Sequence, residues 1–403
     1  MRGGSVAVVG GSIAGCATAL AVSRGGAGKV TVFERADAQL RDRGVGIALH
    51  NDRYVELESA GYVAADMPWA PLTRRVWTVR DGDAEHGRAV GEQPFPFRAY
   101  NWGSLWSELR RRVPEDVDYR SETRIEAVEP DSDGVTLRLP GGRSERFDAV
   151  VGADGYRSVV REAMFPELRP TYAGYLGWRG TSADVADLPS DGNDAHNVVF
   201  PGGHCMIYRI PDGVGGHRLN WVLYTVPPAH LDVDLSTPTS LPPGGATEEL
   251  TAYLRALVAD NFPPYWAARV LRTPAETTLI QPIYDLEVPQ FTSGRMLLVG
   301  DAASVARPHI GGGSVKALQD ATALEAAAVA GGSWKEVMEA YDTARGPVGS
   351  AMVALARRMG SAQVENTPDW SAMRQPEFEA WWGAQNSGSD RSSGFGGHSL
   401  KRP

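Results

Sequence analysis

The apolar positions near the N-terminus predict a strand, a helix and a second strand. A short apolar run covers residues 5–9, an alanine-rich stretch covers 13–23, and another apolar run covers 29–34. Apolar runs of this length are typical of buried strands, and a helix between two of them indicates parallel pairing. Glycines interrupt the opening segment, which a strand-turn-helix explains and a secretory signal peptide does not. The chain therefore opens as an α/β unit.

The pattern changes in the middle of the chain. Residues 76–97 and 171–233 are rich in aromatic and β-branched side chains with proline and glycine between them, which predicts a mostly antiparallel sheet. Residues 135–147 are expected to form a hairpin closed by a Pro-Gly-Gly turn. An apolar strand at 296–299, a glycine-rich loop and an alanine-rich helix at 314–330 then return the chain to α/β. This order predicts two lobes.

The composition mainly excludes certain kinds of partner and site. The formal net charge is -9 and no basic block occurs, which argues against a nucleic-acid surface. The two cysteines, Cys16 and Cys205, cannot form a disulfide framework or a four-cysteine zinc site. No apolar segment approaches the roughly 20 residues that span a bilayer. We therefore expect a cytoplasmic protein without a membrane span, a bound metal or a nucleic-acid partner, and the choice between monomer and homodimer stays open.

The turn after the first strand carries a dinucleotide-binding pattern. Its residues, with the two that end the second strand, are Gly10, Gly11, Ser12, Ile13, Ala14, Gly15, Glu34 and Arg35. Gly10 allows a tight turn, Gly15 lets the helix pack closely on the strand, and Glu34 is placed to accept a hydrogen bond from a ribose hydroxyl. Ser12 replaces the middle glycine and adds bulk. The alternative is a glycine-rich turn without a ligand, and the pattern alone does not separate FAD from NAD.

Two further segments follow predicted strands. Gly300 and Asp301 leave the strand at 296–299, and an Asp at a strand tip can accept hydrogen bonds from polyol hydroxyls. Residues 311–313 are three glycines before a helix, which lets a flat ring approach the backbone beside the helix's positive end. Asp154 follows the third such strand. Taken alone, each segment could also be an ordinary loop or strand-to-helix turn.

In combination these segments resemble the flavoprotein aromatic hydroxylases of the p-hydroxybenzoate hydroxylase fold, the group A FAD monooxygenases, nearest the 2,6-dihydroxypyridine 3-monooxygenase branch. The resemblance covers nearly the whole chain. Besides the first turn, it rests on Gly152-Ala153-Asp154-Gly155, Thr171-Tyr172-Ala173-Gly174-Tyr175, Trp178-Arg179-Gly180, Gly300-Asp301 and Arg307-Pro308-His309. The combination is far more specific than any single segment.

The resemblance implies FAD as cofactor, with NADPH or NADH as a transient reductant. It places the first turn on the ADP part of FAD, Asp301 on the ribityl chain, and Asp154 near both FAD and the visiting nicotinamide. The remaining FAD positions that it implies are Arg43, Gly300, Pro308, Gly311, Gly312 and Gly313. The implied reaction uses O2, through a flavin hydroperoxide, to hydroxylate a small phenol-like or hydroxypyridine-like ring.

The expected fold is α/β with two lobes, α+β in arrangement. It combines a Rossmann-like FAD/NAD(P)-binding fold, an inserted, mostly antiparallel β-sheet domain for the substrate, and C-terminal helices. We expect the FAD-binding domain over 1–75, 98–170 and 276–383. The substrate domain is expected over 76–97 and 171–275. Residues 384–403 are polar and rich in Gly and Ser, which predicts a flexible tail.

A base that removes a ring hydroxyl proton would activate the substrate, and histidine is suited to that task near neutral pH. The catalytic candidates are His50, His204, Tyr208 and His309, and the candidates for substrate contact are Met206, Trp221 and Tyr224. Residues 204, 206 and 208 alternate in one predicted strand and should share a face, as should 220, 222 and 224 in the next. Each histidine is as consistent with a structural hydrogen bond. Arg179 or Arg209 could meet a substrate carboxylate, although Arg209 should face away from Tyr208.

Other reactions share the same cofactor motifs. Epoxidation or Baeyer-Villiger oxidation of a polycyclic metabolite is the nearest alternative. A flavin halogenase should carry a Trp-x-Trp-x-Ile-Pro segment and a catalytic lysine, but no lysine lies between Lys29 and Lys316. A flavin-binding protein without turnover is a further alternative, which reductant consumption dependent on an added ligand would exclude.

Overall fold

The computed structural model describes residues 2–37, 45–229, 241, 244–386 and 396. Its N-terminal unit has the predicted order: β1 (Ser5–Val9), α1 (Ile13–Arg24) and β2 (Lys29–Phe33). Strand β1 pairs in parallel with β2 on one side and with β10 (Ala149–Gly152) on the other. All but the first residue of β1 is buried, because strands of a sheet covered on both faces are apolar throughout.

This first sheet has six strands in the order β16-β17-β10-β1-β2-β6. Its remaining members are β6 (Asp118–Arg120), β16 (Thr292–Ser293) and β17 (Met296–Leu298). Strands β1, β10 and β17 run in parallel, so their carboxyl ends lie side by side at one edge. Each of the three predicted cofactor segments begins at one of these strand ends. The sheet therefore brings together segments that lie far apart in the sequence.

The second sheet has nine strands in the order β18-β15-β11-β14-β13-β12-β4-β5-β3. These strands are β3 (Gly46–His50), β4 (Ala70–Val79), β5 (Arg88–Asn101), β11 (Thr171–Ser182), β12 (Asp194–Phe200), β13 (Gly203–Pro211), β14 (His217–Thr225), β15 (Leu279–Glu287) and β18 (Ser304–Val305). Pairing is antiparallel except between β12 and β4. The sheet is wider than the sequence predicts, because β3, β15 and β18 join it from segments assigned to the cofactor domain.

A separate three-stranded sheet contains the predicted hairpin. It consists of β7 (Ala127–Pro130), β8 (Val135–Arg138) and β9 (Ser144–Phe147), and the turn between β8 and β9 runs through Pro140–Gly142. The helices outside the N-terminal unit are α2 (Asn51–Ser59), α3 (Trp102–Arg112), α4 (Val159–Met164), α5 (Glu248–Asn261), α6 (Pro264–Leu271), α7 (Gly313–Ala330), α8 (Trp334–Gly360) and α9 (Gln375–Asn386). None of them, within the described part of the chain, is both long and apolar enough to cross a membrane.

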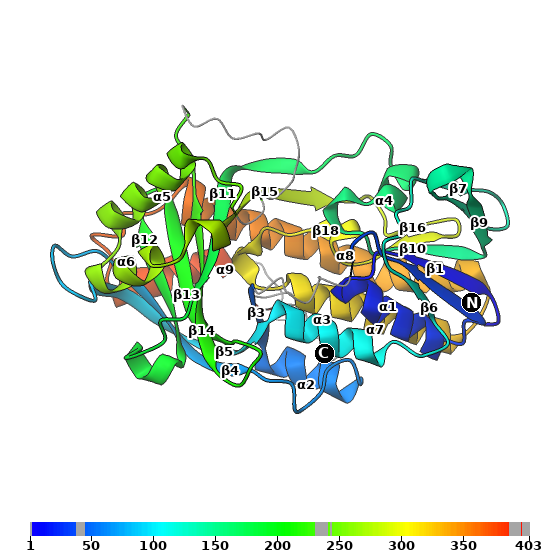
Figure 1. Cartoon of the computed structure of the whole chain (residues 1–403), viewed down its shortest axis with the longest axis horizontal. Coiled ribbons are helices and arrows are strands. Elements are labelled where there is room, and N and C mark those ends of the chain that lie inside the picture. Colours follow the sequence, from blue (N-terminus) through cyan, green and yellow to red (C-terminus); the bar gives the residue numbers. More distant parts are fainter. Residues whose placement is uncertain (1, 38–44, 230–240, 242–243, 387–395, 397–403) are drawn as a thin grey trace.

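The two main sheets lie at opposite ends of the molecule, with α7 and α8 running between them (Figure 1). Helices α5 and α6 cover the outer face of the nine-stranded sheet and bury a cluster there that includes Trp178 and Trp221. The opposite face of that sheet is covered by α9, the end of α8 and the loop before α7. The inner face is therefore the one that meets the predicted flavin loop.

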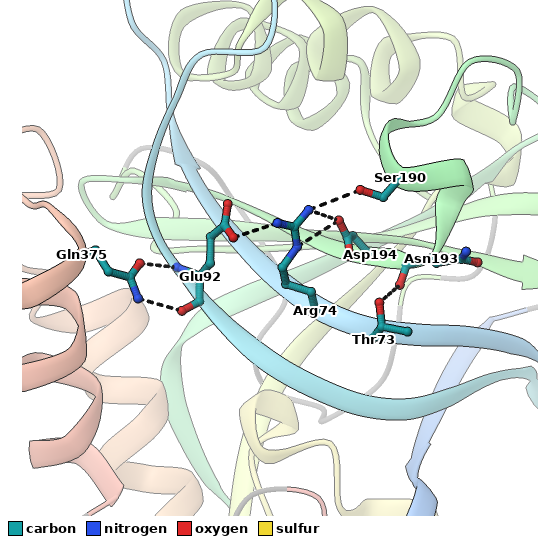
Figure 2. A network of polar contacts seen from close by, with 7 residues as sticks. All are labelled: Thr73, Arg74, Glu92, Ser190, Asn193, Asp194 and Gln375. Carbon is teal, nitrogen blue, oxygen red and sulfur yellow. Dashed lines mark hydrogen bonds and ion pairs between the residues drawn. The ribbon is translucent and has the colours of Figure 1, made fainter.

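Helix α9 is attached to the inner face by polar and aromatic contacts. The Gln375 amide accepts from the backbone N of Glu92 at 2.8 Å and donates to its carbonyl at 3.0 Å, beside the Arg74–Asp194 ion pair (Figure 2). Trp77 of β4 packs against Phe378 of α9, with ring centroids 5.4 Å apart. These contacts bring the C-terminal helix close to the face that carries the substrate candidates.

The predicted tail begins inside α9, because residues 384–386 are helical. Within the rest of the tail only Gly396 is described, and its N–H donates to the carbonyl of Ile310 at 2.9 Å. The other residues of the predicted tail lie outside the described part of the chain, so the flexibility of the tail stays a prediction.

Candidate active site

The first cofactor segment is a turn that only glycine can form. Gly10 has φ of 101°, and a Cβ added there would lie 2.4 Å from the carbonyl oxygen of Ala153. A Cβ on Gly15 would lie 1.8 Å from the carbonyl oxygen of Gly10. Backbone packing this close leaves no room for a side chain, so helix α1 begins directly above the strand end. Its first N–H groups point at the edge of the sheet, as a pyrophosphate site requires.

The peptide groups of Gly11 are held on both sides. Its N–H donates to Oε2 of Glu34 at 2.7 Å, and its carbonyl accepts from Nε1 of Trp106 at 3.0 Å and from the Tyr119 hydroxyl at 2.9 Å. Glu34 is buried and also accepts from the N–H of Ala36. Glu34 thus fixes the glycine turn, its contact with a ribose hydroxyl stays a prediction, and Arg35 is exposed.

The second segment contains a carboxylate with a spare acceptor. Oδ2 of Asp154 accepts from the N–H of Val159 at 2.7 Å, whereas Oδ1 is buried and has no hydrogen-bond partner among the described residues. Burial raises the pKa of Asp154. Arg161 links this segment to the third one, because its guanidinium donates to the carbonyl of Ala302 at 3.1 Å. A buried unpaired oxygen in a cradle of backbone turns fits a ligand that supplies a hydroxyl or N–H donor.

A buried charged triad, which the sequence did not reveal, lies under the Gly300 turn. Asp320 accepts from Lys316 at 2.8 Å, from Arg345 at 2.7 Å and from the N–H of Gly300 at 2.8 Å. Lys316 also donates to the carbonyl of Gly300 at 2.8 Å. The three charged side chains are at most 2% exposed. They hold both sides of the Gly300 peptide unit, and the neighbouring Asp301 is exposed beside them.

The glycine loop before α7 leaves space for a flat group. Gly311 has φ of 61° and follows a short 3₁₀ turn over Pro308–Ile310. A Cβ on Gly313 would meet no atom within 4 Å, and the same holds for Gly155 in the second segment. Open space at both loops, together with the glycine turn at α1 and the spare Asp154 oxygen, fits a long nucleotide cofactor such as FAD that spans the three strand ends.

The predicted substrate residues share the inner face of the nine-stranded sheet. The register pairs His204 with Tyr224, Met206 with Val222, and Tyr208 with Asn220. Because directly opposite residues point to the same face, the predicted alternation along β13 and β14 is confirmed.

Two histidines join the sheet to the flavin loop. Nδ1 of His309 lies 3.1 Å from Nε2 of His204, and Nε2 of His309 lies 2.7 Å from the Tyr175 hydroxyl. The Asn197 amide nitrogen lies 3.4 Å from Nδ1 of His204. All four side chains are buried. Burial lowers the pKa of His309 to about 3, and the positive charges of Arg307 and Arg75 act in the same direction.

The pKa of His204 is also lowered, by burial, by His309 and by Arg75. Both imidazoles are therefore neutral near pH 7, and each can donate through one nitrogen and accept through the other. With the Asn197 amide donating to Nδ1 of His204, Nε2 of His204 donates to His309, and His309 donates to Tyr175. The four side chains form a continuous hydrogen-bonded chain between the sheet and the loop.

The chain is similar to known FAD-binding proteins over most of its length. The family model described as an FAD binding domain matches residues 4–356. The chain belongs to this family of FAD-binding proteins. The match confirms the resemblance to group A flavoprotein hydroxylases, and the α/β fold with a large second sheet confirms the predicted fold class.

Relatives of this family member cover most of its length. It is 28% identical over 377 residues to the 2,6-dihydroxypyridine 3-monooxygenase of Paenarthrobacter nicotinovorans, covering 88% of this chain and 90% of that protein. It is 27% identical over 373 residues to the aurachin C monooxygenase/isomerase of Stigmatella aurantiaca, covering 90% of each. The solved 2,6-dihydroxypyridine-3-hydroxylase of Arthrobacter nicotinovorans superimposes with a TM-score of 0.79 at 26% identity, over 93% of this chain and 97% of that one.

The fold is also shared with Klebsiella pneumoniae HpxO, solved with FAD and uric acid, at a TM-score of 0.73 and 21% identity over 94% of this chain and 92% of that one. The chain therefore belongs to a family of FAD-dependent monooxygenases, and its three strand-end segments are the ones that would hold the cofactor.

Two sequence candidates have other positions than expected. Trp221 faces away from the histidines, because it alternates with Asn220 and Val222 on β14. It is fully buried under α5 and α6, and its Nε1 donates to the Thr273 hydroxyl at 2.8 Å. We therefore withdraw Trp221 as a substrate contact. His50 caps α2, with Nδ1 accepting from the N–H of Asp52 at 3.1 Å, so that nitrogen is already engaged.

Arg43 lies outside the described residues, so its contact with FAD stays a prediction. The sequence named Tyr175 only within a family motif and Asn220 only as sharing a face with Tyr224, and it did not single out Asn197. Oδ1 of Asn220 accepts from the N–H of Gly46 at 2.7 Å. A signal did exist for Asn197 and Asn220, because polar residues within apolar strands need buried partners. The sequence alone does not identify the hydrogen-bond partners of Asn197 and Asn220.

Proposed function

We propose that this chain uses NADH or NADPH and O2 to hydroxylate a small aromatic or heteroaromatic ring on FAD. The observation that carries the proposal is the contact between His309 of the flavin loop and His204 of the sheet. It joins the predicted cofactor site to an aromatic-rich face through a buried, neutral and hydrogen-bonded pair. Relatives named for 2,6-dihydroxypyridine and 3-hydroxybenzoate support a ring of this size.

Bound FAD would supply the redox chemistry, accepting a hydride from the nicotinamide and transferring an oxygen atom from O2. The residues of the chain would have three other tasks. Gly10, Asp154 and Asp301 would bind the cofactor, and the buried inner face would exclude water. His204 would accept the ring hydroxyl proton at Nδ1, in place of the hydrogen bond from Asn197, and would pass its Nε2 proton to His309, which makes the ring more nucleophilic.

The dyad is better suited to passing a proton on than to keeping it. Burial beside Arg75 and Arg307 lowers the pKa values of both histidines and disfavours a charged imidazole. A proton that arrives at His204 or His309 is therefore transferred readily to the next hydrogen-bonded side chain. Tyr175 continues that chain from Nε2 of His309.

Epoxidation is the second candidate function, because the chain is 30% identical to the zeaxanthin epoxidase of Nicotiana plumbaginifolia over 332 residues, covering 78% of this chain and 47% of that protein. Oxygen insertion into an isolated double bond removes no hydroxyl proton. The buried dyad therefore favours hydroxylation of a ring that carries an ionisable hydroxyl group.

The test uses the FAD-loaded full chain with a panel of phenols, hydroxypyridines and polycyclic aromatics. NADH and NADPH oxidation is measured together with the mass of the product. We expect oxidation that depends on one class of small ring, with a product heavier by one oxygen atom. His204→Gln and His309→Gln should each lower kcat by about 10²–10⁴-fold, with recovery at high pH where the substrate ionises by itself.

His86→Gln is the matched control, because His86 is exposed and lies against Tyr265 on the outer side of the sheet. It should leave kcat unchanged. A protein that takes up no FAD, or one whose reductant oxidation ignores every ring compound, would refute the proposed function. Equal activity of the dyad variants at neutral pH would refute the role of the histidines.

A further inference from the structure

A single π-helical turn, η8 (Ser361–Glu365), follows helix α8 and lies against strands β11 and β13. It is closed by the N–H of Asn366, which donates to the carbonyl of Ser361 at 2.7 Å, five residues earlier. Such a turn holds one residue more than an α-helical turn and is frequent at functional sites. Residues 362–364 are buried, so the turn faces the interior of the protein.

The contacts at the two ends of this segment place it beside the histidine dyad. At its start, a Cβ added to Gly360 would lie 3.1 Å from Cδ2 of His309. At its end, the Thr367 hydroxyl accepts from the N–H of Gly202, just before β13, at 3.2 Å. The residues between 360 and 367 therefore cross the inner face of the sheet near His204, which is the second residue of β13.

Gln363 lies in the middle of this segment and has a carboxamide without a partner. The residue is 0% exposed, and neither its amide nitrogen nor its amide oxygen forms a hydrogen bond with any described residue. The adjacent Val364 packs with Tyr175 and Tyr224 on the inner face. Oδ1 of Asn197, on the same face, also lacks a partner among the described residues. Because buried polar groups are nearly always paired, a buried donor and acceptor left open together point to a ligand that supplies both partners.

We propose that Gln363 determines substrate specificity by binding a lactam edge, a ring N–H beside a C=O, while the ring hydroxyl of the same substrate lies at His204. This inference rests on the proposed function and narrows its substrate class to hydroxylated lactam rings, such as hydroxypyridones and hydroxyquinolones. A carboxamide has an acceptor oxygen and an NH2 donor, so the cis-amide of a lactam satisfies both at once. One phenol oxygen cannot meet both groups in linear geometry, and a carboxylate offers no donor.

Two polar contacts from different elements would also orient the ring. His204 belongs to β13 and Gln363 to η8, so the hydroxyl and the lactam edge of the substrate would be held from two directions. Two anchors fix a flat ring in its own plane, which selects the carbon atom that faces the oxidant. We therefore expect the affinity to depend on where the hydroxyl stands relative to the lactam edge.

The test compares each lactam with rings that lack its N–H, on the FAD-loaded full chain without reductant. The lactams are the hydroxy-2-pyridone isomers. Each is compared with its N-methyl derivative, in which the donor is blocked, and with the dihydroxybenzene of the same shape, which lacks the ring nitrogen. Binding is measured by isothermal titration calorimetry.

We expect the best lactam to bind about ten- to a hundredfold more tightly than either comparison compound, because each of those leaves a buried group of Gln363 unpaired. Gln363→Met keeps nearly the same length without a carboxamide. It should reduce the preference to within about threefold and bind the dihydroxybenzene at least as well as the wild type does. Gln363→Leu is a second apolar variant, with the same expected result, in case methionine disturbs the packing.

Asn366→Ala is the matched control. Asn366 carries an exposed amide at the end of the same turn, where its Nδ2 donates to the Ser361 hydroxyl at 2.8 Å. The substitution changes the turn but leaves the buried carboxamide of Gln363 in place. It should therefore keep the full preference for the lactam.

The inference would be overturned if no hydroxypyridone bound more tightly than its comparison compounds, or if the apolar variants kept the preference, since a buried water would then be the partner of Gln363. Equal loss of the preference in Asn366→Ala would also overturn it, because the shape of the turn would then decide. Failure of the proposed function has a different signature. A lactam that binds through Gln363 but stimulates no NADH or NADPH oxidation would support the lactam site and count against the monooxygenase reaction.

Discussion

The Asp320 triad offers the sharpest test of how the fold prepares the cofactor site. Asp320→Asn keeps the size of the side chain but removes its charge. Lys316 and Arg345 would then be buried beside an amide, although both depend on the carboxylate at 2.8 and 2.7 Å. Removing one partner of a buried ion pair costs about 3–5 kcal/mol, because the remaining charge is left uncompensated. That is a large share of the roughly 5–15 kcal/mol that holds a domain folded.

The same substitution should weaken cofactor binding. Asp320 accepts from the N–H of Gly300 at 2.8 Å, and this charge-assisted bond helps to hold Gly300 at φ of 56°. Loss of a hydrogen bond to a charged group costs about 1.5–3 kcal/mol, or roughly ten- to a hundredfold in an affinity that depends on it. We therefore expect FAD to dissociate more readily, because Asp301 leaves the sheet at this turn.

Urea unfolding of the apoprotein and FAD titration by flavin fluorescence measure the two effects separately. Glu339→Gln is the matched control. Lys335 and Glu339 form a pair with the same spacing as Lys316 and Asp320, but Lys335 and Glu339 are exposed, with nitrogen and oxygen 3.7 Å apart. Such surface pairs contribute little. If Asp320→Asn unfolded within about 1 kcal/mol of the wild type and bound FAD equally well, then the buried triad would not hold the turn as we argue.

Two further predictions concern acid stability and the outer face of the sheet. Burial lowers the pKa of His196 to about 4 and that of His309 to about 3, both below the 6.5 of an unfolded histidine. The unfolded state therefore binds more protons below pH 6.5, so stability is complete above that pH and falls as the pH drops toward 4, by about 1.4 kcal/mol per pH unit for each histidine. Urea unfolding across this range should show the slope, and His309→Gln should reduce it; an unchanged slope would refute the assignment. Trp221→Phe removes the hydrogen bond to Thr273 and should cost about 1 kcal/mol in unfolding while leaving KM for the ring substrate unchanged. A raised KM would contradict this and indicate that Trp221 contacts the substrate.

Local sequence determined the parts of this protein that depend on neighbouring residues. Glycines after the apolar strand at 5–9 predicted a tight turn, since only glycine fits where a Cβ would lie 2.4 Å from another backbone. Alternation along residues 204–208 and 220–224 predicted which side chains share a face, because the period of a strand is two residues. The same rule, applied to Trp221, would have excluded it from the substrate candidates.

Tertiary structure alone decided which distant side chains meet. His204 and His309 are 105 residues apart in sequence and form the dyad only because the flavin loop packs against the inner face of the sheet. Asp320 and Lys316 have the spacing of an ordinary surface pair on a helix, and their burial follows from the docking of α7 under the Gly300 turn. Backbone conformation is set by nearest neighbours, whereas burial and charge pairing depend on which elements pack together. That information is spread over the whole chain.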